Sequence, residues 1–163
     1  MSDSDPECAT GQTFDDADAF AARLGMEGRL LGMDLGTKTI GLALSDVRRS
    51  IASSLETIRR KKFSVDVVAL LRFTEEHQIA GFVLGLPVNL NGTEGPRAQA
   101  TRAFARNLNQ RSALPILLWD ERMTTQAATR LLIEADSSRK RRAEVVDKMA
   151  ATLILQGALD RMR

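Results

Sequence analysis

Three carboxylates stand where the surrounding pattern is apolar and gives little reason for a charge. Asp34 follows an apolar stretch directly and precedes a glycine turn, and Glu121 closes the apolar run PILLWDE. Asp147 falls in a predicted helix, on the side of Ala151 and away from the polar stripe of that helix. Burying a lone carboxylate is costly, so each of the three needs water, hydrogen-bond donors or a cation.

One interpretation is that the three carboxylates bind the same cation. Three carboxylates that meet at one sheet edge repel one another, and their pKa values rise unless a cation is present. Mg²⁺ or Mn²⁺ fits because hard divalent ions prefer oxygen ligands, whereas Cys8 and His77 are the chain's only cysteine and histidine and support zinc poorly. Two such ions can ready a water molecule and stabilise the leaving oxygen of a phosphodiester. Two plainer interpretations stay open: Glu121 pairs with Arg122, and Asp147 caps a helix or forms a salt bridge.

The alternation of apolar and polar residues predicts the elements that would position these side chains. Two strands joined by a short glycine turn come first, a third strand follows, and helices then alternate with two buried strands. This order favours an α/β fold with a mixed sheet in which the strand of Asp34 is central. Strands are predicted at 29–35, 40–46, 51–58, 80–87 and 115–118, and helices at 65–77, from Pro96, from Thr124 or Thr125 and at 144–162, with a basic loop at 136–143.

The charge is distributed unevenly along the 163 residues, which are enough for one domain of ordinary size. Residues 1–28 hold seven of the 21 acidic residues and one of the 23 basic residues, so the remaining body at 29–163 has a net charge of +8. We expect 1–28 to be an acidic, disordered arm, in which 15–24 could form a short helix. A basic body indicates either a polyanionic partner or simply a soluble basic surface.

The composition also bears on the compartment. No apolar run approaches the roughly 18 residues of a membrane helix, and the acidic start is unlike a secretory signal. A single cysteine excludes an internal disulfide and fits a reducing cytosol. The sequence therefore predicts a cytoplasmic protein that does not associate with membranes.

Four sequence blocks together resemble the YqgF family, whose members are also called RuvX. The blocks are DLGTKTIGLALSD, GLPVNLNGTEG, DERMTTQAA and VDKMAATLILQGALD, and their order and spacing match over about residues 29–161. The resemblance implies a ribonuclease H-like fold of the RuvC type, a mixed five-stranded sheet flanked by helices. It also implies Mg²⁺- or Mn²⁺-dependent phosphodiester hydrolysis in 5′-end maturation of pre-16S rRNA. Carried over, the family's catalytic and metal-binding acids are Asp34, Glu121 and Asp147.

Candidate contacts to nucleic acid surround these acids. Amides, hydroxyls and basic side chains next to the acids suit phosphate groups, although an ordinary loop, an N-cap and solvated cations explain them almost as well. The chain departs from the family at Thr39, where DxGxKRIG has arginine, which puts one phosphate contact in doubt. The basic runs 59–62 and 139–142 would add affinity that depends on salt, without base recognition. The predicted nucleic-acid-binding residues are Lys38, Asn91, Arg122, Thr124, Thr125, Arg141 and Lys148.

Other functions compete with that of an rRNA-processing nuclease. A Holliday-junction resolvase acting on branched DNA would use the same acids, and a homodimer would suit its two-fold junction, whereas a monomer would suit an RNA end. A non-catalytic module that binds nucleic acid or ribosomal particles would bind without cleaving. The run DLGT also resembles the phosphate loop of actin-like ATPases, but those close two such domains around a nucleotide.

Overall fold

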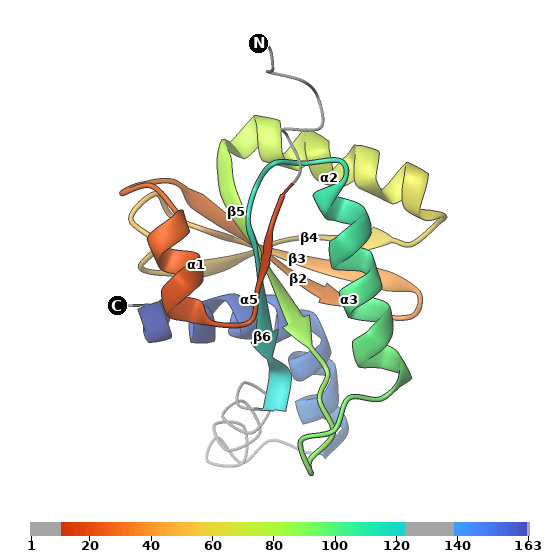
Figure 1. Ribbon diagram of the computed structural model, residues 1–163. Coiled ribbons are helices and arrows are strands. Elements are labelled where there is room, and N and C mark those ends of the chain that lie inside the picture. The colour runs from red at the N-terminus through yellow and green to blue at the C-terminus, as the bar shows by residue number, and fades with distance from the viewer. Residues whose placement is uncertain (1–10, 123–138, 163) are drawn as a thin grey trace.

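The protein is a three-layer α/β structure (Figure 1). The computed structural model describes the backbone of residues 11–122 and 139–162 and the side chains of residues 11–122 and 149–162. The described strands are β1 (Thr13–Phe14), β2 (Arg29–Leu35), β3 (Thr39–Ser45), β4 (Ala52–Arg59), β5 (Ile79–Leu86) and β6 (Ile116–Asp120). The described helices are α1 (Ala17–Arg23), α2 (Phe63–His77), α3 (Pro96–Asn109) and α5 (Arg139–Met162).

The strands form one mixed sheet in the order β1-β6-β5-β2-β3-β4. β2, β3 and β4 pair antiparallel, whereas β5 and β6 continue from β2 in parallel. The predicted central place of the strand that carries Asp34 is confirmed, because β2 lies between β3 and β5. The sheet has six strands where five were expected, since β1 adds a short parallel pairing to the outer edge of β6.

The N-terminal segment corrects the expectation of a disordered arm over residues 11–28. Asp16 caps α1 by accepting hydrogen bonds from the amides of Asp18 and Ala19, and the side chain of Phe20 is fully buried. The short helix expected at 15–24 is present as α1. Acidic composition suggested disorder, but one buried aromatic side chain and a pairing of two residues are enough to fix this stretch on the body.

Each face of the sheet has its own apolar core. α2 and α3 cover one face, where the core includes Met33, Leu84 and Phe104. α1 and α5 cover the other, where Val83, Leu117 and Ile154, among others, are buried. The burial of aliphatic side chains on both faces explains why β5 and β6 read as continuous apolar runs.

Helix α5 lies very close to the centre of the sheet. A Cβ placed on Gly32 of β2 would be 2.8 Å from Cβ of Leu155 and 3.1 Å from the carbonyl oxygen of Ala151. A glycine is therefore required in this strand for the helix to pack at this distance.

Helix α5 also starts earlier than expected. It begins at Arg139, so the end of the predicted loop 136–143 is helical. Arginine and lysine are good helix formers, and a basic run does not by itself indicate a loop.

Two of the predicted segments cannot be compared with the structure. The helix predicted from Thr124 or Thr125 lies outside the described residues, as do residues 1–10 of the acidic arm. Within the described part of the chain, no helix has the length and apolarity needed to cross a membrane.

Candidate functional site

Asp34 lies near the carboxyl end of β2 and is half-buried. It pairs with Gly41 of β3, and its Cβ is 3.8 Å from where a Cβ of Gly41 would stand. Side chains alternate along a strand, so Asp34 shares the face of Gly32, which is the face covered by α5. The carboxylate thus ends a central strand beside that helix.

Glu121 directly follows β6 at a helical residue, and its side chain lies on the α5 side of the sheet. Leu117 and Trp119 of β6 belong to the α5 side of the sheet, and Glu121 comes two residues further on. Between β6 and β2 lies β5, where Gly85 has no side chain. A Cβ on Gly85 would be 2.8 Å from Oε1 of Glu121 and 2.5 Å from Cδ1 of Ile154. Glu121 therefore extends over β5 towards β2.

The carboxyl groups of Asp34 and Glu121 share a hydrogen bond. Burial, this hydrogen bond and the negative charge of Asp34 raise the pKa of Glu121 to about 7, and Asp120 adds a smaller contribution in the same direction. The positive charge of Arg97 acts in the opposite direction. When Glu121 is protonated its carboxyl can donate to Asp34, and when both groups are ionised they repel each other.

The third predicted acid, Asp147, lies in α5, one turn before Ala151, whose Cβ is 3.7 Å from where a Cβ of Gly41 would stand. Its side chain is outside the described residues, so the meeting of three carboxylates stays a prediction. Among the side chains at 11–122 and 149–162, no three groups of metal-ligand type gather in one place.

Arg122 contacts Asp120 and two loop carbonyls, whereas the sequence suggested a pairing with Glu121. Its guanidinium makes a two-pronged ion pair with Asp120, 2.6 Å from Nη2 to Oδ2, and donates to the backbone carbonyls of Asn89 and Leu90 at 3.3 Å. The ion pair lowers the pKa of Asp120. The suggested pairing of Glu121 with Arg122 is thus wrong. Arg122 instead fixes the loop before α3 to the end of β6.

The other predicted contacts fall in three groups. The Asn91 carboxamide oxygen accepts from the amide and hydroxyl of Thr93, which closes the loop before α3 on itself. Lys38 is exposed in the β2–β3 turn, four residues after Asp34 in the chain. Thr124 and Thr125 lie outside the described residues, and the side chains of Arg141 and Lys148, in α5, are not described either.

The structure adds two arginines that the sequence did not single out as site residues. Arg60 and Arg97 line a small cavity of about 90 Å³ beside the end of β2. Arg60 belonged to a run interpreted only by its charge. Arg97 stands alone after Pro96, and nothing in its local sequence marks it.

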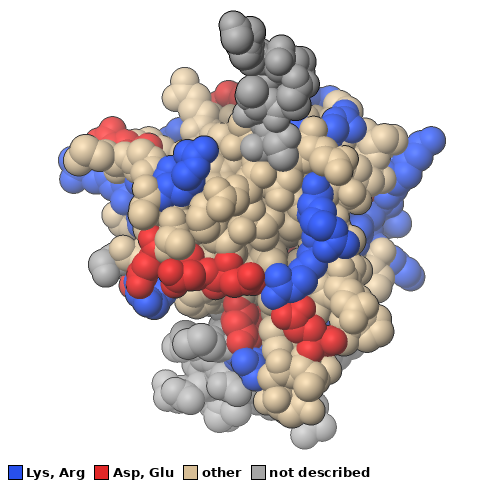
Figure 2. All heavy atoms as spheres, viewed as in Figure 1, with Lys and Arg blue, Asp and Glu red and all other residues tan. Residues whose placement is uncertain are grey.

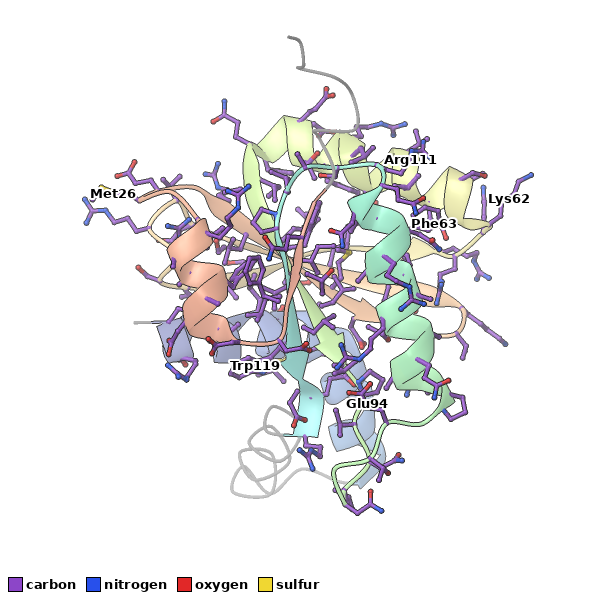
Figure 3. The ribbon with its side chains drawn as sticks, in the orientation of Figure 1. Met26, Lys62, Phe63, Glu94, Arg111 and Trp119 are labelled. Atoms are coloured by element: carbon purple, nitrogen blue, oxygen red, sulfur yellow. The ribbon has the colours of Figure 1, made fainter. Side chains whose placement is uncertain are left out.

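A second, wider hollow of about 430 Å³ lies between the loop before α1 and the loop before α3. Asp15, Asp120 and Arg122 line it, together with half-buried Trp119 at the end of β6 and Glu94 before α3 (Figure 3). Figure 2 shows acidic side chains gathered on this face with basic ones among them. Arg102 joins the two loops through ion pairs with Glu94 and Asp15 at 2.7 and 3.1 Å.

Superposition on solved structures identifies the fold. The chain superposes on RuvC of Thermus thermophilus with a TM-score of 0.53, at 13% identity over 83% of this chain and 96% of that one, in a structure titled as a complex with a Holliday junction substrate. A second structure of Thermus thermophilus RuvC gives the same TM-score at 14% identity, over 82% of this chain and 96% of that one. The fold is therefore the RuvC type of the ribonuclease H-like class, as the sequence predicted.

Comparison with related sequences identifies the family. The family described as "RuvX: Holliday junction resolvase" matches residues 28–161. A Rhodobacter capsulatus protein named "Putative pre-16S rRNA nuclease" is 64% identical over 89% of this chain and 91% of its own length. One of the same name from Paracoccus denitrificans is 57% identical over 91% of this chain and 94% of its own. The chain belongs to the RuvX family, whose members are named as nucleases.

Proposed function

We propose that this protein is a nuclease dependent on Mg²⁺ or Mn²⁺, with Asp34, Glu121 and Asp147 as the metal-binding acids. The observation that carries the proposal is the contact between the carboxyl groups of Asp34 and Glu121 at the ends of β2 and β6. Two desolvated carboxyls that share a proton are a site where a divalent cation can replace that proton.

The donor set fits such an ion. Both described acids offer oxygen atoms, and His77, the chain's only histidine, instead stacks on Phe73 with ring centroids 6.3 Å apart. Carboxylate oxygens favour magnesium and manganese over zinc. Bound here, divalent ions would supply water activation and charge neutralisation at a phosphodiester.

The protein's own residues have distinct tasks in this proposal. Asp34 and Glu121 hold the site from two rigid strand ends, and Gly85 leaves the space in which they meet. The positive charge of Arg97 favours the ionised form of Glu121, the form that binds a cation. Half-buried Trp119 by itself offers little surface for stacking bases, so recognition of backbone and shape is expected.

The substrate that we propose is the 5′ end of pre-16S rRNA, processed in the cytoplasm on free RNA or on ribosomal particles. The names of the relatives support it. The family description favours one second candidate, resolution of branched DNA. Both substrates require the same acids.

Incubation with a pre-16S rRNA fragment and with a four-way DNA junction, each in Mg²⁺ or Mn²⁺, tests the proposal. Asp34→Asn, Glu121→Gln and Asp147→Asn should each abolish cleavage while retaining the fold by circular dichroism. Glu56→Gln is the matched control because Glu56 is exposed on β4. Near wild-type cleavage by Asp34→Asn refutes the mechanism, and binding without any cleavage indicates a non-catalytic module.

A further inference from the structure

We propose that Arg60 and Arg97 form, with the β2–β3 turn, a binding site for one backbone phosphate of the nucleic-acid substrate. The inference rests on the proposed function and names a contact that adjoins the carboxylate pair. Neither arginine was among the contacts predicted from the sequence.

The site is a defined cavity. It measures about 90 Å³, opens to solvent, and is bordered by the end of β2, the β2–β3 turn, the residue after β4 and the first turns of α3. Besides the two arginines, Gly36, Thr37 and Thr101 line it. The space is large enough for several water molecules, which a phosphate group could displace.

Both guanidinium groups are held in place by backbone carbonyl oxygens. Nη1 of Arg60 donates to the carbonyl oxygen of Gly36 at 2.6 Å, and its guanidinium carbon is 6.0 Å from the ring centroid of Phe104. Nη2 of Arg97 donates to the carbonyl oxygen of Leu35 at 3.3 Å. A guanidinium has five N–H donors, so each arginine has donors left after these contacts.

Some other described arginines behave differently, although Arg49 also donates only to backbone carbonyls. Arg102, Arg122 and Arg161 are each paired with a carboxylate, at distances of 2.6 to 3.1 Å. Neither Arg60 nor Arg97 forms an ion pair with any acid of the described residues. Two neighbouring cations that line one cavity and form no ion pair with a described acid favour an anion, and planar guanidinium groups match phosphate oxygens well.

The position connects this cavity to the proposed chemistry. Leu35, which lines the cavity, directly follows Asp34. The positive charge of Arg97 acts to lower the pKa of Glu121. Arg97 and Thr37 are exposed, and so is Lys38 in the same turn. A chain of phosphates can therefore pass over the turn with one group in the cavity and a neighbouring group at the acids, which favours a polynucleotide over a free ion.

The test is binding without cleavage. Fluorescence anisotropy in EDTA, with an end-labelled single-stranded RNA of about 20 nucleotides, is measured for wild type, Arg60→Gln, Arg97→Gln and the double variant over a series of salt concentrations. Arg106→Gln is the matched control, an exposed arginine near the other end of α3. Each site variant should weaken binding by about tenfold, since a charge-assisted contact is lost. The slope of log affinity against log salt should fall by about 0.7 for each contact.

Several results separate the possible failures. Wild-type protein that binds no RNA at any salt concentration overturns the proposed function and this inference together. Wild-type binding that both variants retain, with the same slope, overturns only the inference. Weaker binding with an unchanged slope indicates a structural role for the arginines and also overturns it. Arg97→Lys, which keeps the charge, should recover most of the slope. Titration with inorganic phosphate completes the test: uptake of free phosphate without any effect of the variants on RNA contradicts the assignment to a backbone phosphate.

Discussion

Glu121 reaches the carboxyl group of Asp34 across a strand that separates them, over a residue with no side chain. β5 lies between β2 and β6, and Gly85 occupies the crossing point. The contact is therefore a product of three strands and needs no loop to bring the acids together. A site built on strand ends is more rigid than one built on loops.

The raised pKa of Glu121 predicts a pH-dependent stability. Its pKa rises from 4.5 to about 7 on folding, so between these values the folded protein holds a proton that the unfolded chain has released. The free energy of unfolding should fall as pH rises through this window. Glu121→Gln removes the effect. In metal-free buffer its stability relative to wild type should increase by about 1–3 kcal/mol between pH 4.5 and 8, measured by urea unfolding. Glu56→Gln serves as the control, and a difference for Glu121→Gln that does not vary with pH contradicts the prediction.

Divalent ions should stabilise the folded protein more at high pH than at low pH. Mn²⁺ competes with the proton shared by Asp34 and Glu121, so it should raise the melting temperature more at pH 8 than at pH 5. At a concentration of 100 times Kd the gain would be about 2.7 kcal/mol. Differential scanning fluorimetry with and without EDTA measures it. An equal gain in Asp34→Asn shows that the ion binds elsewhere.

Gly85→Ala should damage the site more than the fold. The added Cβ would be 2.8 Å from Oε1 of Glu121 and 2.5 Å from Cδ1 of Ile154, so both side chains must move. We expect a loss of stability of about 1–3 kcal/mol. Cleavage should fall about a hundredfold, because small displacements of catalytic groups have large effects on rate. Gly25→Ala is the control, since its nearest neighbouring atom is 4.0 Å away. Wild-type cleavage by Gly85→Ala contradicts this account of how the acids meet.

Phe20→Ala tests whether the N-terminal segment is part of the folded body. Phe20 is fully buried and contacts Phe14 edge to face, with ring centroids 6.0 Å apart. Its truncation should destabilise the protein by about 3–5 kcal/mol. Met26→Ala, at a side chain that is 96% exposed, should change stability by less than about 0.5 kcal/mol. Equal denaturation midpoints for the two variants would mean that α1 does not pack in solution.

Arg122→Ala should loosen the loop at 89–95 without unfolding the domain. The variant loses the ion pair with Asp120 and the hydrogen bonds to two loop carbonyls. Global stability should fall by only about 1 kcal/mol, because the pair is partly exposed. Hydrogen exchange should accelerate at 89–95. Arg161→Ala removes the ion pair with Asp18 and should affect α1 instead. Unchanged exchange at 89–95 rules out the anchoring role.

Asp34 and Glu121 could be predicted from the sequence because each ends an apolar run, and the ends of parallel strands lie at one edge of a sheet. The central place of β2 could be predicted because an antiparallel hairpin followed by alternating helices and buried strands puts its first strand beside the later parallel strands. Arg97 could not be found in this way, since the role proposed for it depends on a cavity formed by segments distant in sequence. β1 escaped prediction because two residues show no periodicity, and the partner of Arg122 depended on geometry at the end of β6.

The pairing of β1 with β6 has a practical consequence for anyone preparing this protein. The stretch that matches the family begins at residue 28, after β1 and α1. A gene trimmed to that stretch would yield a polypeptide whose β6 has an open outer edge and whose site for Phe20 is empty. Exposed strand edges invite association between molecules. Such a shortened product should aggregate on purification, and β6, which directly precedes Glu121, would pair with a strand on one side only.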